Sequence, residues 1–175
     1  MTVRVGIIMG SDSDLSIMRQ ACDILDQFGV DYDINIYSAH RLPRETAEYS
    51  LTAMDKGYNV IIAGAGGAAH LPGVVAAHTI LPVIGVPIKT SALGGVDSLY
   101  SIVQMPKGIP VATVAINGSA NAALLAIEIM AGQDKSLQDK LIAYRRQMAA
   151  DALAKDSKLK DIGIDKYLQQ KEAGK

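Results

Sequence analysis

Two short loops of this sequence carry the residue types that proton transfer and anion binding require. Residues 38–41 read Ser-Ala-His-Arg, and residues 64–73 read Gly-Ala-Gly-Gly-Ala-Ala-His-Leu-Pro-Gly. An imidazole takes up and gives up a proton near neutral pH, and an arginine presents a planar set of donors that suits phosphate. Consecutive glycines let backbone N–H groups turn toward a small anion such as a carboxylate. The two loops therefore predict acid–base chemistry on an anionic ligand.

Within the first loop, His40 is the candidate general acid/base and Arg41 the candidate phosphate ligand. A histidine between the end of a strand and the start of a helix is rarely needed for packing, and the neighbouring guanidinium favours the neutral, basic imidazole. Arg41 is also explained as a solvated loop residue. His70 in the second loop either contacts the ligand or orients the loop, and its residue type leaves both open. His78 lies among alanines and valines and is predicted to be structural or at an interface.

A third polar segment, residues 10–14, reads Gly-Ser-Asp-Ser-Asp. Ser11 suits the start of a helix, where free N–H groups and the helix dipole attract an anion, although a plain N-cap explains it equally well. The carboxylate of Asp14 would repel a phosphate. It suits sugar hydroxyls, or it simply favours the helix dipole.

The pattern of apolar residues predicts strands alternating with helices along most of the chain. Strands are expected at residues 3–9, 30–37, 58–63, 83–86 and 111–116, with 30–37 nearest an edge. Helices are expected from residues 11–13 to 28, from 43 to about 56, from about 72, from 97 to 104, and from 119 or 121 to 130. This alternation predicts an α/β protein with a flavodoxin-like three-layer αβα fold around a parallel five-stranded sheet.

The chain is predicted to form a single catalytic domain over residues 1–175, with a core at 1–132 and a C-terminal helical extension at 133–175. One long helix is expected from residue 134 to about 153, because apolar residues recur on one stripe. A short helix is expected around Ile164, Tyr167 and Leu168, followed by a frayed end at 169–175. Ligands of open parallel sheets bind beyond the carboxyl ends of the strands, and all the polar loops follow strands. A shared ligand crevice is therefore expected there.

The composition excludes several classes of protein. The formal net charge is −1, and no basic run points to nucleic acid or a membrane surface. Residues 59–89 are almost free of charge, but Gly and Pro interrupt them too often for a membrane span. The single Cys22 and the absence of a signal-like start are consistent with a reducing compartment, so a cytoplasmic location is expected. No zinc-type spacing, P-loop lysine or GxGxxG fingerprint occurs, so neither a metal nor a cofactor is expected.

The chain resembles the 5-(carboxyamino)imidazole ribonucleotide mutase family of purine biosynthesis (PurE, class I). The matching segments cover nearly the whole chain before the last long helix: GSDSDLSIM from Gly10, SAHR from Ser38, AGAGGAAHLPG from Ala63, GVP from Gly85, GVDSLYSIVQMPKGIPV from Gly95 and NAALLA from Asn121. The resemblance implies a flavodoxin-like subunit in a homo-octamer. It also implies an isomerase that moves the carboxylate of a ribonucleotide from an exocyclic nitrogen to an imidazole carbon without metal, ATP or biotin.

The resemblance also implies roles for individual residues. His40 matches the general acid/base, which protonates the ring carbon as carbon dioxide leaves nitrogen and finally removes the ring proton. Residues that match substrate-binding positions are Ser11, Asp14 and Arg41 for phosphate and ribose, and Gly66, Gly67, Ala68 and His70 around the base and the migrating carboxylate. Ser38 is a further substrate-binding residue of this set.

Two segments depart from the family pattern, and two other functions stay open. Residues 117–120 are shorter than the expected glycine-alanine stretch, and the tail beyond Lys155 follows no family pattern. The nearest alternative is the related carboxylase, which adds free carbon dioxide to aminoimidazole ribonucleotide. A non-catalytic nucleotide-binding protein is the alternative of another class. A phosphoacceptor module is rejected because its aspartate is missing after residues 58–63, and a flavin carrier is disfavoured by the few aromatic residues.

Overall fold

The computed structural model of the protein describes residues 4–173. Val3, the predicted start of the first strand, and residues 174–175 of the predicted frayed end lie outside this range. The chain divides into two compact units, residues 1–133 and 134–175. The first unit holds the sheet and every residue predicted to act on a ligand.

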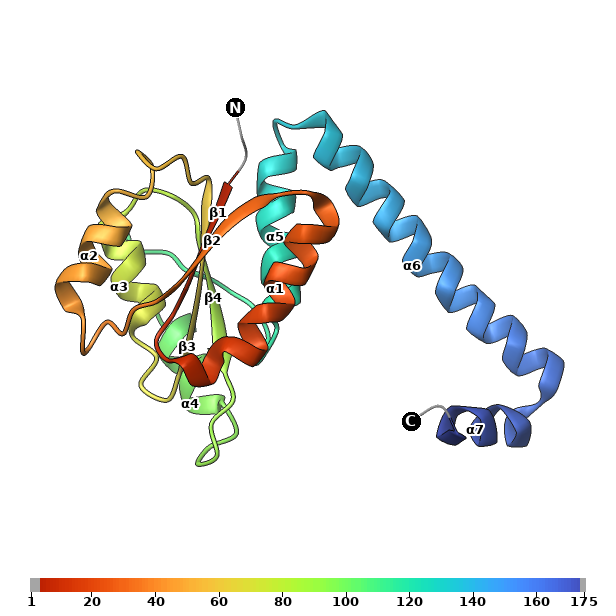
Figure 1. Ribbon diagram of the computed structural model, residues 1–175. Helices are drawn as coiled ribbons and strands as arrows, with labels where there is room; N and C mark the ends of the chain where they lie inside the picture. Colours follow the sequence, from red (N-terminus) through yellow and green to blue (C-terminus); the bar gives the residue numbers. More distant parts are fainter. Residues whose placement is uncertain (1–3, 174–175) are drawn as a thin grey trace. The chain divides into compact units, whose positions relative to one another are not determined.

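The first unit is built on a parallel five-stranded sheet in the order β2-β1-β3-β4-β5, which is the flavodoxin-like order (Figure 1). The strands are β1 Arg4–Met9, β2 Asp31–Ile36, β3 Val60–Gly66, β4 Val83–Ile88 and β5 Ala112–Thr113. Every neighbouring pair is parallel. The predicted α/β fold is confirmed, and β2 lies at the edge as expected.

Most strands differ from the predicted bounds by one or two residues at an end, and β4 continues to Ile88 instead of ending at residue 86. The differences are largest in β3 and β5. β3 continues through Gly66 instead of ending at Ala63, because Gly64 to Gly66 pair with Val86 to Ile88 of β4. The predicted strand at residues 111–116 shortens to Ala112–Thr113, since Asn117 takes a left-handed conformation with φ 59° and turns the chain. The turn hydrogen-bonds back to β4, as the Asn117 N–H donates to the Pro87 carbonyl over 2.8 Å.

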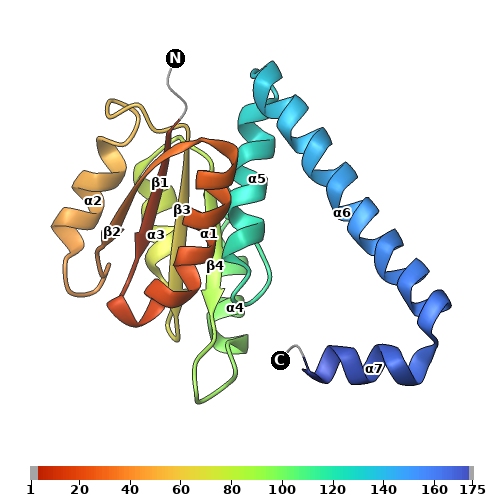
Figure 2. The ribbon, with the colours of Figure 1, turned by 45° about the vertical axis from the view of Figure 1, so that its right-hand side comes forward.

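Helices cover both faces of the sheet (Figures 1 and 2). Helices α2 Pro43–Leu51, α3 Leu71–His78 and α4 Val96–Val103 pack on one face, while α1 Leu15–Phe28 and α5 Ser119–Ala131 lie side by side on the other. α1 ends at Gly29 as predicted, with a left-handed φ of 64°. α2 ends at Leu51 rather than near residue 56, because the chain turns through Gly57, also left-handed, to enter β3.

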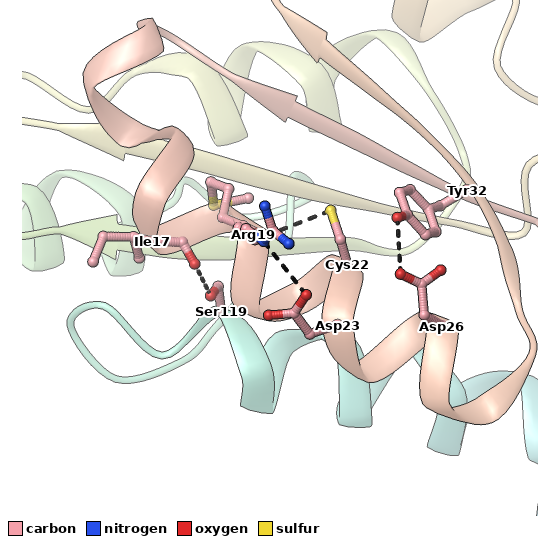
Figure 3. Close-up of polar contacts among 8 residues, drawn as sticks. Ile17, Arg19, Cys22, Asp23, Asp26, Tyr32 and Ser119 are labelled. Atoms are coloured by element: carbon pink, nitrogen blue, oxygen red, sulfur yellow. Dashed lines mark hydrogen bonds and ion pairs between the residues drawn. The ribbon is translucent and has the colours of Figure 1, made fainter.

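The core of this unit is made of β-branched residues and alanines. Ile7, Ile62 and Ile84 on the three central strands are fully buried, as are Ala122 and Ala126 on α5. The small side chains of α5 let it approach α1 closely. Figure 3 shows the polar contact that joins the two helices, in which the Ser119 hydroxyl donates to the Ile17 carbonyl. These contacts hold the helix that follows the Ser11–Asp14 corner.

The second unit consists of α6 Lys135–Ile162 and α7 Ile164–Ala173. The predicted start is confirmed, because the Asp134 carboxylate accepts from the N–H groups of Ser136 and Leu137. The predicted end near residue 153 is wrong, since helix-forming residues continue to Gly163 after the apolar stripe fades. The frayed end is also wrong for residues 169–173, which are helical. Over residues 4–173 no helix combines the length and apolarity needed to cross a membrane.

Candidate active site

A cavity of about 780 Å³ lies at the carboxyl ends of β1 to β4. Its size is typical of pockets for small ligands. The loops after these four strands all contribute to its lining. It is lined by all nine residues predicted as site residues: Ser11, Asp14, Ser38, His40, Arg41, Gly66, Gly67, Ala68 and His70. The expected convergence of the three loops is therefore present, while the role of each residue stays a prediction.

Two imidazoles meet in this cavity. The distance from His40 Nε2 to His70 Nδ1 is 2.8 Å, and the rings meet edge to face at an interplanar angle of 84°. Both side chains are exposed to the cavity solvent. Only one proton fits between the two nitrogens, so one ring donates and the other accepts. This contact fixes the ring of His40 relative to the turn that follows β3.

The loop at residues 38–42 is a tight turn that presents Arg41 to the cavity. The N–H groups of Arg41 and Leu42 both donate to the Ser38 carbonyl, over 3.1 and 2.7 Å. Pro43 then begins α2 at a first-turn position, as predicted. The Arg41 guanidinium donates through Nη2 to the Gly10 carbonyl over 3.1 Å, so it reaches across to the end of β1. Arg41 therefore joins the first loop to the Ser11–Asp14 corner.

The Ser11–Asp14 corner is a short 3₁₀ turn, and α1 begins after it at Leu15. Ser11 acts as the N-cap of the turn, since its hydroxyl oxygen accepts from the Ser13 N–H over 3.3 Å. Asp14 stands at the N-cap position of α1, but its carboxylate accepts no hydrogen bond from the helix N–H groups. Capping therefore accounts for Ser11 and leaves the carboxylate of Asp14 without a structural task in α1.

Asp14 is the buried carboxylate of the cavity, with 7% of its surface exposed. Burial raises the pKa of this carboxyl above its ordinary value, and the neighbouring Asp12 adds to the rise. Hydrogen bonds from the Ser13 hydroxyl and the Ser11 backbone oppose it in part. A carboxyl with a perturbed pKa inside a cleft is a candidate functional group.

The glycine-rich turn differs in detail from the expected nest of free N–H groups. Gly67 adopts a left-handed φ of 64°, which explains the glycine, but its N–H donates to the Ser98 hydroxyl over 2.9 Å. The N–H groups of Ala69 and His70 close onto carbonyls within the same turn. Within residues 4–173, the Ala68 N–H is the turn donor that has no such partner. The turn therefore offers fewer backbone donors to an anion than its glycines suggested.

Sequence reasoning missed Ser98, which holds this turn in place. The side chain is fully buried, and its hydroxyl donates to the Ile88 carbonyl over 2.8 Å while accepting from Gly67. Ser98 thus ties the end of β4 to the turn after β3. The signal that could have found it is a serine on the apolar face of a helix, where a polar group needs a partner.

Replacing Ser98 by alanine is expected to lower kcat about tenfold and to destabilise the fold by about 1–2 kcal/mol, because the buried Ile88 carbonyl and the half-buried Gly67 N–H lose their partner. Steady-state kinetics and urea unfolding measure the two effects. Ser101→Ala is the matched control, because that hydroxyl donates to the Asp97 carbonyl of its own helix. Equal activity in both variants would show that the bridge does not position the turn.

The structure also adds residues after β4 to the cavity. Ile88, Lys89, Thr90 and Ser91 line it, and none of them is among the nine predicted site residues. The Thr90 hydroxyl lies 3.2 Å from the nearer Asp97 carboxylate oxygen and donates to it. Asn117, which follows β5, does not line the cavity. Its side chain instead accepts from the Lys89 N–H over 2.8 Å.

In the described part of the chain, no group of three or more His, Cys, Asp or Glu residues is arranged to hold a metal ion. Arg41 and Lys89 are the cavity's lysine or arginine residues. The arrangement can therefore bind an anionic ligand through cationic side chains and backbone donors, and it can move a proton through the His40–His70 pair.

The fold and cavity define a flavodoxin-like α/β protein with a cavity at the topological switch of its sheet. The family model described as AIR carboxylase matches residues 4–151. The chain is 57% identical to the N5-carboxyaminoimidazole ribonucleotide mutase of Thermotoga maritima over 97% of this chain and 99% of that protein. The chain belongs to the AIR carboxylase family, and the family resemblance read from the sequence is confirmed.

Other relatives fit the same family. The chain is 55% identical to the phosphoribosylaminoimidazole carboxylase of Saccharomyces cerevisiae over 95% of this chain, but that match covers only 29% of the yeast protein. A crystal structure of Treponema denticola PurE superposes with a TM-score of 0.80 at 34% identity, covering 90% of this chain and 99% of that one. A Treponema denticola PurE2 variant gives a TM-score of 0.85 at 32% identity, covering 91% and 99%.

Proposed function

We propose that this protein converts 5-(carboxyamino)imidazole ribonucleotide to 4-carboxy-5-aminoimidazole ribonucleotide in purine biosynthesis. The observation that carries the proposal is the juxtaposition of His40 and His70, 2.8 Å apart, in the cavity that Arg41 and Asp14 also line. Relatives named as the mutase match the chain over nearly its whole length. The enzyme is accordingly an isomerase.

The reaction requires one residue to carry protons at the base. In net terms, the bond between nitrogen and the carboxyl carbon breaks and its electron pair stays on nitrogen. A bond from the ring carbon to the same carboxyl carbon forms, and one proton passes from the ring carbon to the nitrogen. His40 is assigned this transfer, because an imidazole both gives and accepts a proton near neutral pH. The carboxyl group leaves nitrogen as carbon dioxide, which the ring carbon then captures. Retention of carbon dioxide between this release and its capture requires a site shielded from water.

His70 is assigned a second task in addition to contact with the substrate. Its Nδ1 lies within hydrogen-bond distance of His40 Nε2, so it determines which nitrogen of His40 carries the proton. A positioned base needs this kind of orienting partner. The pair therefore acts as one proton-handling unit in which His40 faces the reacting carbon.

The rest of the cavity is assigned to the ribonucleotide. Arg41 and Ser11 hold the phosphate, and Asp14 accepts from the ribose hydroxyls. Ser38, which follows β2, lines the same cavity and also binds the substrate. The turn at Gly66, Gly67 and Ala68 surrounds the base and its carboxylate. The position of Arg41 against the end of β1 supports a phosphate site near the Ser11–Asp14 corner.

The test is direct conversion by the pure protein. Incubation with the carboxyamino nucleotide, without ATP or added metal, is expected to yield the 4-carboxy isomer, detected by ultraviolet absorbance and chromatography. Labelled bicarbonate in the buffer is expected to leave little label in the product, because the carboxyl group is transferred internally. Full labelling would establish the carboxylase instead. Nucleotide binding without any product would establish a non-catalytic binding protein.

We further propose that the protein works as a homo-octamer in the cytoplasm. Both units expose large apolar side chains that suit contact with other copies of the chain. On the second unit these are Ile142, Met148, Leu153, Leu159, Ile164 and Leu168. Light scattering that gives the mass of one chain would refute the assembly.

A further inference from the structure

Two cations line the cavity at different strands of the sheet. Arg41 follows β2 and reaches to the Gly10 carbonyl at the end of β1. Lys89 follows β4, next to the turn at Gly66 and Gly67. Because β3 lies between β1 and β4, the ends of those two strands are about 10 Å apart across the sheet. The cavity therefore has a cation on each side of the β3 turn.

The proposed ligand has two anionic groups, so two cationic side chains suit its binding. The proposed substrate carries a phosphate at one end and a carboxylate on its base at the other. Arg41 is bonded to the Gly10 carbonyl, so it serves the end of the cavity near β1. The turn after β3 supplies few free N–H groups, because the N–H groups of Gly67, Ala69 and His70 already donate to acceptors within the protein. A second anion therefore needs a side-chain cation, and Lys89 supplies it.

The backbone of Lys89 is held more firmly than that of an ordinary loop residue. Its N–H donates to the Asn117 side chain over 2.8 Å. The residues on either side are also fixed, because the Ile88 carbonyl accepts from Ser98 and the Thr90 hydroxyl donates to Asp97. Asn117 takes its left-handed conformation in the loop between β5 and α5. This loop thus anchors the segment that presents Lys89.

We propose that Lys89 is a further substrate-binding residue that pairs with the migrating carboxylate, whereas Arg41 holds the phosphate. The proposal rests on the proposed function, because it takes the carboxylated ribonucleotide as the ligand. Lys89 keeps the carboxylate beside the β3 turn, next to His70. It therefore discriminates carboxylated nucleotides from the same nucleotide without the carboxylate.

The experiment compares two ligands on three variants by isothermal titration calorimetry. The ligands are 4-carboxy-5-aminoimidazole ribonucleotide and its decarboxylated counterpart, which share the phosphate and ribose. The Lys89→Met variant keeps the length of the side chain and removes its charge. It is expected to raise the dissociation constant of the carboxylated ligand about tenfold and to leave that of the decarboxylated ligand unchanged. Lys89→Arg is expected to restore most of the preference. Lys107→Met is the matched control, since Lys107 is exposed and does not line the cavity.

The outcomes separate this proposal from its alternatives. If Lys89→Met lowers the affinity for both ligands equally, Lys89 contacts the phosphate or supports the loop, and the proposal is overturned. If it weakens neither ligand, Lys89 is a solvated lysine, and the proposal is again overturned. In both cases the unaltered protein still isomerises the carboxyamino nucleotide. If the unaltered protein neither binds nor isomerises that nucleotide, the proposed function is refuted, and the role of Lys89 inferred from it is refuted as well.

Discussion

The His40→Asn variant is expected to lose turnover by about 10³-fold or more in kcat while still binding the ribonucleotide. An amide cannot transfer a proton, but it keeps a polar side chain in the cavity, although it is too short to replace the contact of His40 Nε2 with His70. The dissociation constant of the 4-carboxy ribonucleotide should change by less than about fivefold, roughly 1 kcal/mol. Single-turnover kinetics and calorimetry on the same preparation measure the two quantities.

His78→Asn provides the control for this variant. His78 lies on α3 outside the cavity lining, and its Nδ1 bonds the Val74 carbonyl of its own helix over 2.8 Å. That variant should keep turnover close to that of the unaltered protein. Normal turnover by His40→Asn would refute the catalytic assignment. Loss of both turnover and nucleotide binding would show that His40 supports the site rather than the chemistry.

The fold could be predicted because its signals are local. Apolar runs rich in β-branched residues mark the strands, and Gly29 and Pro43 end and begin helices through their own backbone preferences. The convergence of the three loops also follows from the parallel order alone, since the carboxyl ends of the strands meet at one edge. For these reasons all nine predicted site residues line one cavity.

What could not be predicted depends on contacts between distant residues. The length of β3 follows from pairing with β4, and no local feature distinguishes Gly64 as a strand residue. The Gly67 N–H is consumed by Ser98, which comes 31 residues later. Lys89 becomes a cavity residue only once β4 is placed beside β3. Local sequence therefore locates the site, while tertiary contacts decide which of its groups are free to bind a ligand.

The end of α6 illustrates a different limit. Its apolar stripe predicts an end near residue 153, but the helix continues beyond the stripe to Ile162. Ion pairs four residues apart, such as Lys160 with Asp156 at 2.6 Å, accompany the continuation. An exposed helix of this kind is set by propensity and by the next glycine, so amphipathicity alone underestimates its length.

The Asp14→Asn variant is expected to lose about 10²-fold in kcat/KM, because the proposed ribose hydroxyls lose a charged acceptor. The same variant should melt at a higher temperature at neutral pH. Burial raises the pKa of Asp14, so the folded protein binds this proton more tightly than the unfolded chain. Between the ordinary carboxyl pKa and the raised pKa of folded Asp14, the unfolded state therefore binds fewer protons than the folded state. The free energy of unfolding of the unaltered protein falls as pH rises through this range.

The stability gain should accordingly depend on pH. Below the ordinary carboxyl pKa of about 3.9, Asp14 is protonated in both the folded and the unfolded state. Its charge then no longer contributes to the difference in melting temperature between the unaltered protein and the Asp14→Asn variant. The gain grows as pH rises toward the raised pKa of the folded state and is constant above it. Thermal melts followed by circular dichroism from acid to neutral pH measure this curve.

Asp12→Asn is the matched control, because Asp12 sits in the same turn, is exposed and does not line the cavity. It should change kcat/KM little. If Asp14→Asn instead lowers the melting temperature and leaves kcat/KM intact, the carboxylate supports the turn and does not bind ribose. The predicted combination of lower activity with higher stability would mean that a buried charge is retained here at the expense of stability, because the ligand needs it.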